Sequence, residues 1–394
     1  MISEEEENFE KEKQILEEEL NGEYIIKEKL SQRCVLNEQM RENRSVYLAI
    51  KKEDNSPHVI KQMNSFASET FNEKFASEHL KNHSTITLSK TTCLENNTKL
   101  FVISNYCEGG TLETYFNENY LKKGKAFEID KIIYVMKNII FGLKTLFECE
   151  LIHRDIKKGN LVIKYFDDES SKEKNILKSY IIIIDFGSCK MKTRENSNII
   201  EVKGTPPNIH PTLYNINQID SKNNDAEVLN EELDLWSLGV VCLQLFGGRL
   251  STEKEKELEV QVIDESYYIP LNDDTTVELV RFIDKLLQKN KENQFKIDEL
   301  MNDKFINKHP KSFTKFTKDM VVDKIELIDN KEYIRLNISN ELNFDYDDLL
   351  DLNKENFHKN INDCFFDLNQ DFLFTQPVLI PIIGVEEEKD NEFL

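Results

Sequence analysis

The chain has 394 residues, more than one average domain, which suits a two-lobed domain with added tails. Its 51 basic and 73 acidic residues give a net charge of −22, which argues against binding to nucleic acid or to an anionic membrane. Seven scattered cysteines form no CxxC pair, so we expect no disulfide framework, no zinc site, and a reducing compartment, the cytoplasm or alternatively the nucleus. No signal pattern and no apolar run of about 20 residues is present, so no membrane span is expected.

The N-terminal part of the chain changes pattern at Tyr24. Residues 1–22 are rich in glutamate and helix formers, with a thin apolar stripe, which predicts a short acidic extension that packs on the domain. After it come short alternating segments, and we expect the first three strands at residues 24–30, 34–38 and 45–51.

The middle of the chain contains one strongly helical segment. Residues 99–112 read as a strand followed by a diglycine turn, and residues 129–149 carry apolar residues at helical spacing, which predicts a buried helix. Residues 161–163 and 180–184 are expected to form a hairpin, and residues 275–306 two closing helices.

Residues 153–160, reading HRDIKKGN, place an acid, a base and an amide at the spacing that phosphoryl transfer needs. Asp155 would accept the proton of a substrate hydroxyl, Lys157 would reach the transferred phosphate, and Asn160 would hold a metal ion. A run of four isoleucines then leads into Asp185-Phe186-Gly187, where Asp185 would hold a second metal ion.

This ordered set resembles the eukaryotic-type protein kinases, serine/threonine class. The resemblance implies an α+β, bilobal fold, with a small β-rich N-lobe at residues 23–107 and a large, mainly helical C-lobe at residues 108–310. The acidic extension 1–22 would precede this kinase domain, and an acidic extension of unknown role would follow it at residues 311–394. ATP and Mg²⁺ are the implied cofactors.

The resemblance also implies the nucleotide-binding residues. Leu48-Ala49-Ile50-Lys51 looks like the family's VAIK motif, so Lys51 would bind the α- and β-phosphates; strand alternation favours it over Lys52. Its partner would be a glutamate on the next helix, with Glu73 the first candidate and Glu69 and Glu78 left open. Around the hinge, the backbone from Asn105 to Cys107 would meet adenine.

The activation segment is implied at residues 188–203, closing on Gly204-Thr205-Pro206. Thr205 together with Lys157 is the serine/threonine pattern. Glu201 stands where many relatives carry a phosphorylated residue, and Arg154 would pair with it as with a phosphate, which would keep the loop active without phosphorylation. The alternative is an exposed acid with no such role.

Two features depart from the family. The turn between the first two strands was aligned with residues 30–36, which contain no glycine, and a Cβ at each position limits close approach of the backbone to phosphate. The usual buried ion pair after the activation segment is replaced by Thr212 and Gln294, two neutral groups. The motif Asp234-Leu235-Trp236-Ser237-Leu238-Gly239 does match, and its aspartate is implied to hydrogen-bond the HRD backbone.

The predicted function is therefore ATP-dependent phosphorylation of serine or threonine hydroxyls on a protein substrate, a basic one being the class that the negative charge would suit. The alternative is a pseudokinase that acts as a binding or scaffolding module, which the missing glycines favour and the intact chemical groups oppose. A small-molecule kinase is a weaker rival, because the motif Gly204-Thr205-Pro206 and the helix that carries DLWSLG are protein-kinase features.

Overall fold

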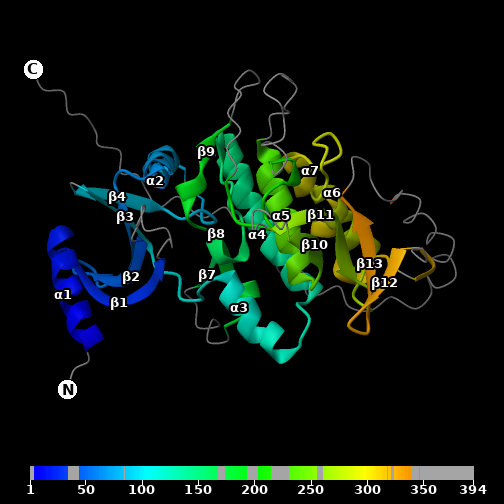
Figure 1. Ribbon diagram of the computed structural model, residues 1–394, viewed down its shortest axis with the longest axis horizontal. Coiled ribbons are helices and arrows are strands. Elements are labelled where there is room, and N and C mark those ends of the chain that lie inside the picture. Colours follow the sequence, from blue (N-terminus) through cyan, green and yellow to red (C-terminus); the bar gives the residue numbers. More distant parts are fainter. Residues whose placement is uncertain are drawn as a thin grey trace, which may run out of the picture. The chain divides into compact units, whose positions relative to one another are not determined.

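The described residues all belong to one compact unit, residues 1–349, and they form two lobes. A computed structural model describes residues 4–33, 44–83, 85–96, 98–166, 174–192, 203–213, 230–254, 261–316, 318–320, 324–338 and 346. The small lobe is an antiparallel five-stranded sheet in the order β1-β2-β3-β5-β4 (Figure 1). Its strands are β1 (Tyr24–Arg33), β2 (Arg44–Lys51), β3 (Pro57–Asn64), β4 (Thr91–Asn96) and β5 (Lys99–Asn105). The strand expected at residues 34–38 lies outside the described residues.

Helix α1 (Glu4–Glu19) covers one face of this sheet. Leu16 and Leu20 are buried there against Tyr47 and Ile60. The carboxylate of Glu12 accepts a hydrogen bond of 2.6 Å from the Tyr47 hydroxyl, which fixes the helix on the strand beneath it. The N-terminal extension thus packs on the domain, as its apolar stripe predicts.

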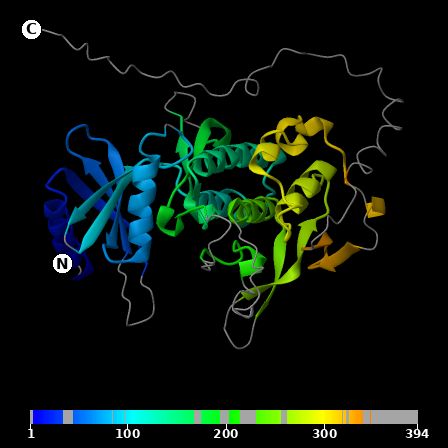
Figure 2. The same cartoon turned by 90° about the horizontal axis from the view of Figure 1, so that it is seen from above.

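Helix α2 (Ser68–Leu80) lies on the other face, so the sheet stands between two helices (Figure 2). Successive residues of a strand point to opposite faces. Ile60 of β3 therefore faces α1, and Lys61 faces α2, where the Glu73 side chain is 2% exposed. This alternation brings a lysine and a glutamate together behind the sheet.

The large lobe is built around two buried helices. Helix α4 (Ile129–Glu148) buries the residues that its helical spacing predicts, and α5 (Glu231–Leu245) is buried from Asp234 to Leu243, as expected for a helix that is apolar on all sides. The other helices of eight or more residues here are α3 (Leu112–Asn119) and α6 (Val277–Leu286), and the shorter ones are α7 (Ile297–Met301) and α8 (Lys304–Asn307).

Two short strand pairs place the chemical residues. In the hairpin of β7 (Leu161–Tyr165) and β8 (Ser179–Ile183), Leu161 pairs with Ile183. Because the strands are antiparallel, the residue before β7 and the residues after β8 lie at the same end, and these are Asn160 and Asp185. The pair β6 (Leu151–Ile152) and β9 (Lys190–Met191) ties the chain after Asp185 to the chain before His153.

A second sheet, of four strands, extends the large lobe in the order β10-β11-β13-β12. The strands β10 (Arg249–Lys254) and β11 (Gln261–Pro270) follow α5, whereas β12 (Ile325–Ile328) and β13 (Lys331–Asn337) come from the extension expected after residue 310 (Figure 1). Ile334 and Leu336 of β13 are buried against the lobe. At least residues 325–337 of the extension are therefore an integral part of the large lobe.

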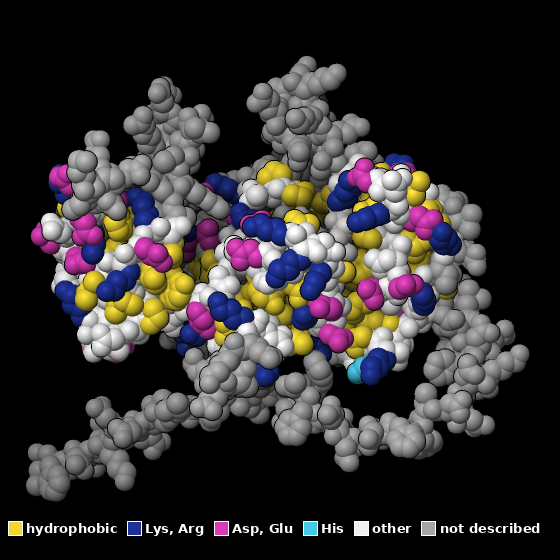
Figure 3. All heavy atoms as spheres, turned by 90° about the horizontal axis from the view of Figure 1, so that it is seen from below, with side chains coloured by type: hydrophobic (Ala, Val, Ile, Leu, Met, Phe, Trp, Pro, Cys, Tyr) yellow, Lys and Arg dark blue, Asp and Glu magenta, His cyan; other side chains and the backbone are white. Residues whose placement is uncertain are grey.

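The surface carries both charges. On the face drawn in Figure 3, basic and acidic side chains are interspersed between apolar ones over the described residues. Among the helices that the structure describes, none combines the length and the apolar character needed to cross a bilayer.

Candidate nucleotide and phosphoryl-transfer site

The centre of the site is an ion-pair network on Lys61. Its ammonium lies 2.6 Å from Oε1 of Glu73 and 2.6 Å from Oδ1 of Asp185. The three residues come from β3, α2 and the turn after β8, so the network joins the small lobe to the large lobe. Glu73, the first candidate among three glutamates, is thus the helix residue that meets the β3 lysine.

The prediction of Lys51 is wrong. This residue ends β2, and its ammonium lies 2.7 Å from Glu53, not from Glu73 or Asp185. The error is a strand count: β1 continues to Arg33, so the strand that ends in Ile50-Lys51 is the second, and Ile60-Lys61 belongs to the third. In both strands an apolar run is followed by a lysine, as Ile50-Lys51 and as Ile60-Lys61. The motif alone therefore does not tell which lysine belongs to the third strand.

Burial and charge act against each other in this network. Burial raises the pKa of Asp185, but the Lys61 ammonium more than offsets it, so the pKa is lowered and the carboxylate stays charged. For Glu73, burial and the neighbouring Asp185 outweigh Lys61 and raise its pKa. Burial lowers the pKa of Lys61, yet the two carboxylates leave it raised. Asp185 is therefore the carboxylate of this network that is better suited to bind a metal cation.

Asp155, Lys157 and Thr205 form a triangle of hydrogen bonds. The Thr205 hydroxyl donates to Oδ1 of Asp155 at 2.8 Å, and the Lys157 ammonium donates to Oδ2 of Asp155 at 2.8 Å and to the Thr205 hydroxyl at 2.5 Å. The structure therefore brings together three residues from two predicted motifs. It also shows that the Asp155 carboxylate can accept a hydrogen bond from a hydroxyl group while the Lys157 ammonium donates to the same carboxylate.

A second set of contacts fixes the loop that carries Asp155. Asp234 is fully buried, and its carboxylate accepts hydrogen bonds of 2.7 Å from the backbone amides of His153 and Arg154, as the resemblance implies. Nε2 of His153 is 3.1 Å from the carbonyl of Ile184, while Nδ1 is 3.2 Å from the amide of Asp155. The catalytic loop is thereby held against the strand that leads to Asp185.

The donor set fits magnesium. The amide nitrogen of Asn160 donates to the Asp155 carbonyl at 2.8 Å and to its carboxylate at 2.9 Å, which turns the amide oxygen to the remaining side. That oxygen and the charged carboxylate of Asp185 are hard oxygen ligands of the kind Mg²⁺ takes together with substrate phosphates. The described residues contain no cluster of three or more His, Cys, Asp or Glu arranged for a metal.

The backbone is strained at two points of the site. Arg154 has φ +64° and Asp185 has φ +68°, a region that side chains other than glycine seldom adopt. Arg154 uses Nε to donate to the carbonyl of Ser188 at 2.7 Å. Glu201, its expected partner, lies outside the described residues, so that pairing stays a prediction.

The hinge residues lie where the chain leaves β5. Asn105 is the last residue of β5, and the carbonyl of Cys107 accepts a hydrogen bond of 3.2 Å from the amide of Gly110. Gly109 packs on Ile163 of the large lobe so tightly that a Cβ would lie 2.6 Å from that side chain. Adenine binding by Asn105 and Cys107 stays a prediction.

The stretch expected as the turn over the phosphates, residues 30–36, is only partly described by the structure. Residues 30–33 belong to β1, whose last pair is Arg33 with Arg44, and the segment between the two strands, residues 34–43, lies outside the described residues. Its sequence, CVLNEQMREN, also has no glycine. The sequence from residue 30 to residue 43 therefore contains no glycine, which is the departure from the family noted in the sequence.

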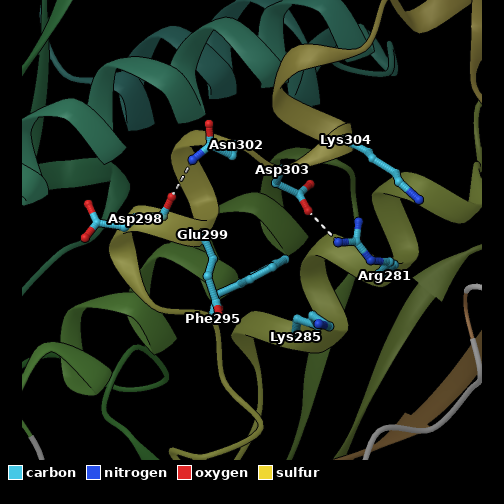
Figure 4. Close-up of a pocket in the computed structure, with 8 residues that line it drawn as sticks. All are labelled: Arg281, Lys285, Phe295, Asp298, Glu299, Asn302, Asp303 and Lys304. Carbon is cyan, nitrogen blue, oxygen red and sulfur yellow. Dashed lines mark hydrogen bonds and ion pairs between the residues drawn. The ribbon is translucent and has the colours of Figure 1, made fainter.

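One surface hollow lies apart from these residues. Its volume is about 530 Å³, and Figure 4 shows it between α6, α7 and α8, where Arg281 and Asp303 form an ion pair of 2.7 Å. It contains none of the predicted site residues.

Comparison with known proteins agrees with this geometry. The family model described as "Protein kinase domain" matches residues 42–306, more than half of the chain. The chain belongs to the protein kinase family.

Three of the curated relatives carry the name serine/threonine-protein kinase. The meiosis-specific serine/threonine-protein kinase mek1 of Schizosaccharomyces pombe is 27% identical over 223 residues, which cover 55% of this chain and 45% of that protein. SKM1 of Saccharomyces cerevisiae is 25% identical, covering 53% of this chain and 30% of that protein. Human Nek5 is 26% identical, covering 68% of this chain and 35% of that protein. Each match spans less than half of the relative's length.

Proposed function

We propose that the chain transfers the γ-phosphate of ATP to serine or threonine hydroxyls of protein substrates. The observation that carries this proposal is the triangle of Asp155, Lys157 and Thr205, in which a threonine hydroxyl already donates to the carboxylate of Asp155. The relatives named as serine/threonine kinases support the same class of acceptor.

The residues divide the reaction into holding and proton transfer. Lys61 would bind phosphate oxygens, and Glu73 would hold its ammonium in place. Asp155 would accept the proton of the substrate hydroxyl. At the same time the hydroxyl oxygen would form a bond to the γ-phosphorus, and the bond from that phosphorus to ADP would break. Lys157 would stabilise the charge that develops on the transferred group. Asn160 and Asp185 would hold Mg²⁺, which supplies neutralisation of the phosphate charge.

Positioning supplies most of the rate in this type of reaction, because little covalent chemistry falls to the protein. The hydrogen bonds from the His153 and Arg154 amides to Asp234 serve this purpose, since they hold the loop of Asp155 from behind.

The test is transfer of radiolabelled phosphate from ATP to degenerate peptides with a fixed serine, threonine or tyrosine. Wild type is expected to label the serine or threonine peptides, and Asp155→Ala to lose at least about 10²-fold of the rate. Asp130→Ala is the matched control, because Asp130 is an exposed aspartate at the start of α4. Equal labelling by wild type and Asp155→Ala would favour the scaffold alternative.

A further inference from the structure

The end of the activation segment, residues 203–213, is anchored to the large lobe at several places. Thr205 is held by Asp155 and Lys157. Three residues on, the amide of the Asn208 side chain donates to the carbonyl of Ile156 at 3.0 Å, and the Asn208 carbonyl accepts from the Ser237 hydroxyl at 2.7 Å. The segment therefore runs as a strap from the catalytic loop to α5.

His210 closes this strap. Its side chain is buried, with 1% of the residue exposed, and its ring packs edge-on against Trp236 with 5.2 Å between ring centroids. Nδ1 accepts a hydrogen bond of 3.3 Å from the amide of Thr212. The ring is also hydrogen-bonded to the backbone of Gln288, in the chain after α6. One side chain thus joins the strap to α5 and to the end of α6.

The two positions that usually form a buried ion pair in this family are occupied here by the neutral residues Thr212 and Gln294. Gln294, 3% exposed, donates its amide to the carbonyl of Leu286 at 2.8 Å, and Thr212 meets His210 through its backbone. A buried neutral imidazole with both nitrogens engaged avoids the desolvation that a buried ion pair must overcome. The contact that would otherwise be electrostatic is here made by ring packing and two neutral hydrogen bonds.

We propose that His210 is a positioning residue for phosphoryl transfer, which locks the strap so that Thr205 stays in hydrogen-bonding contact with Asp155 and Lys157. The inference rests on the proposed function for its kinetic consequence, but its structural consequence is independent of activity. The contacts of His210 are with Trp236, Thr212 and Gln288, and not with Lys61, Asn160 or Asp185. Its loss should weaken peptide binding and leave ATP binding unchanged.

The test compares His210→Ala, His210→Phe and His210→Asn with wild type. In the first two, KM for a serine peptide is expected to rise about tenfold while KM for ATP stays within about twofold. His210→Phe keeps a ring against Trp236 and removes both hydrogen bonds, so it carries the test if the alanine variant does not fold. His210→Asn keeps an acceptor near the position of Nδ1 and should recover part of the loss.

His309→Ala is the matched control. Nδ1 of His309 also accepts from the amide two residues on, Lys311, at 3.2 Å, but His309 is exposed and far along the chain from the strap. It should leave both KM values unchanged. An effect of His309→Ala equal to that of His210→Ala would contradict the proposal.

Amide hydrogen exchange over residues 203–213 provides a readout that needs no activity. The His210→Ala and His210→Phe variants are expected to exchange faster there, and no faster over β3 and α2. If wild type transfers no phosphate, the proposed function fails, whereas this local exchange pattern still decides the role of His210. Unchanged exchange in the segment, or a loss of ATP binding equal to that of peptide binding, would overturn the proposal.

Discussion

The ammonium of Lys61 lies 2.6 Å from a carboxylate oxygen of Asp185, although 124 residues separate them in sequence. The contact exists because β3 presents Lys61 toward α2, and because the β7–β8 hairpin presents Asp185 at the end where Asn160 also lies. Glu73 holds the same ammonium from a third element. The cation that we propose for phosphate binding and the anion that we propose for metal binding thus lie side by side.

Replacing Lys61 with methionine should reduce kcat/KM for peptide phosphorylation by about 10²-fold or more, because the ammonium aimed at the phosphates is lost. Lys51→Met is the matched control, since the Lys51 ammonium pairs with the exposed Glu53. Steady-state kinetics with radiolabelled ATP measures both. A large loss in Lys51→Met, with Lys61→Met near wild type, would reverse the assignment.

Truncating Leu16 tests the role of α1. Leu16 is 2% exposed in the core beneath α1, so Leu16→Ala should lower the free energy of unfolding by about 2–5 kcal/mol, through lost burial and the cavity left behind. Its neighbour Ile15 is 54% exposed, and Ile15→Ala should change the stability by less than about 0.5 kcal/mol. Urea denaturation measures the difference. Equal effects would mean that α1 does not contribute to the core.

Tyr346 tests the attachment of the C-terminal extension. Its hydroxyl donates to one oxygen of the fully buried Asp284 at 2.8 Å, and the Tyr267 hydroxyl donates to the other at 2.5 Å. Tyr346→Phe leaves that carboxylate one donor short, which should cost about 1–3 kcal/mol of unfolding free energy. Tyr333→Phe, a half-buried tyrosine that alternates with the buried Ile334, serves as the control and should be nearly neutral.

Acid should weaken the strap through His210. Burial lowers the pKa of His210 from its ordinary value of 6.5 to about 4, with the Lys289 ammonium acting in the same direction. Between these values the unfolded chain binds a proton on His210 and the folded chain does not, so stability falls as the pH drops from 6.5 toward 4. The loss from this residue should approach about 3 kcal/mol near pH 4.

The His210→Phe variant isolates this contribution, because phenylalanine does not titrate. The difference in unfolding free energy between wild type and the variant should be constant above pH 7 and should shrink as the pH falls toward 4. Parallel stability curves for the two proteins over this range would show that His210 is not buried in its neutral form.

The clustering of the large-lobe site residues was predictable because most of it is local. Asp155, Lys157 and Asn160 lie within six residues, and Asp185 follows a strand that the isoleucine run indicates. Contacts between residues that are far apart in the sequence were harder to predict. Counting residues 34–38 as a strand makes the second strand, which ends at Lys51, look like the third, and this one miscount places the lysine at Lys51 instead of Lys61.

The second sheet shows the same limit in another form. Residues 321–338 alternate only weakly in sequence, and their strands form because β11 offers an open edge: Tyr267 of β11 pairs with Leu336 of β13, 69 positions away. Such a pairing depends on tertiary context and not on local propensity.

The central claim is that Lys61, Asn160 and Asp185 form one site for ATP and Mg²⁺. The most direct measurement is the thermal unfolding midpoint of the full chain with ATP, with and without Mg²⁺, for wild type and Asp185→Asn. The account predicts a rise with ATP that requires Mg²⁺ in wild type and is lost in the variant. No rise in wild type, or an equal rise in both proteins, would contradict it.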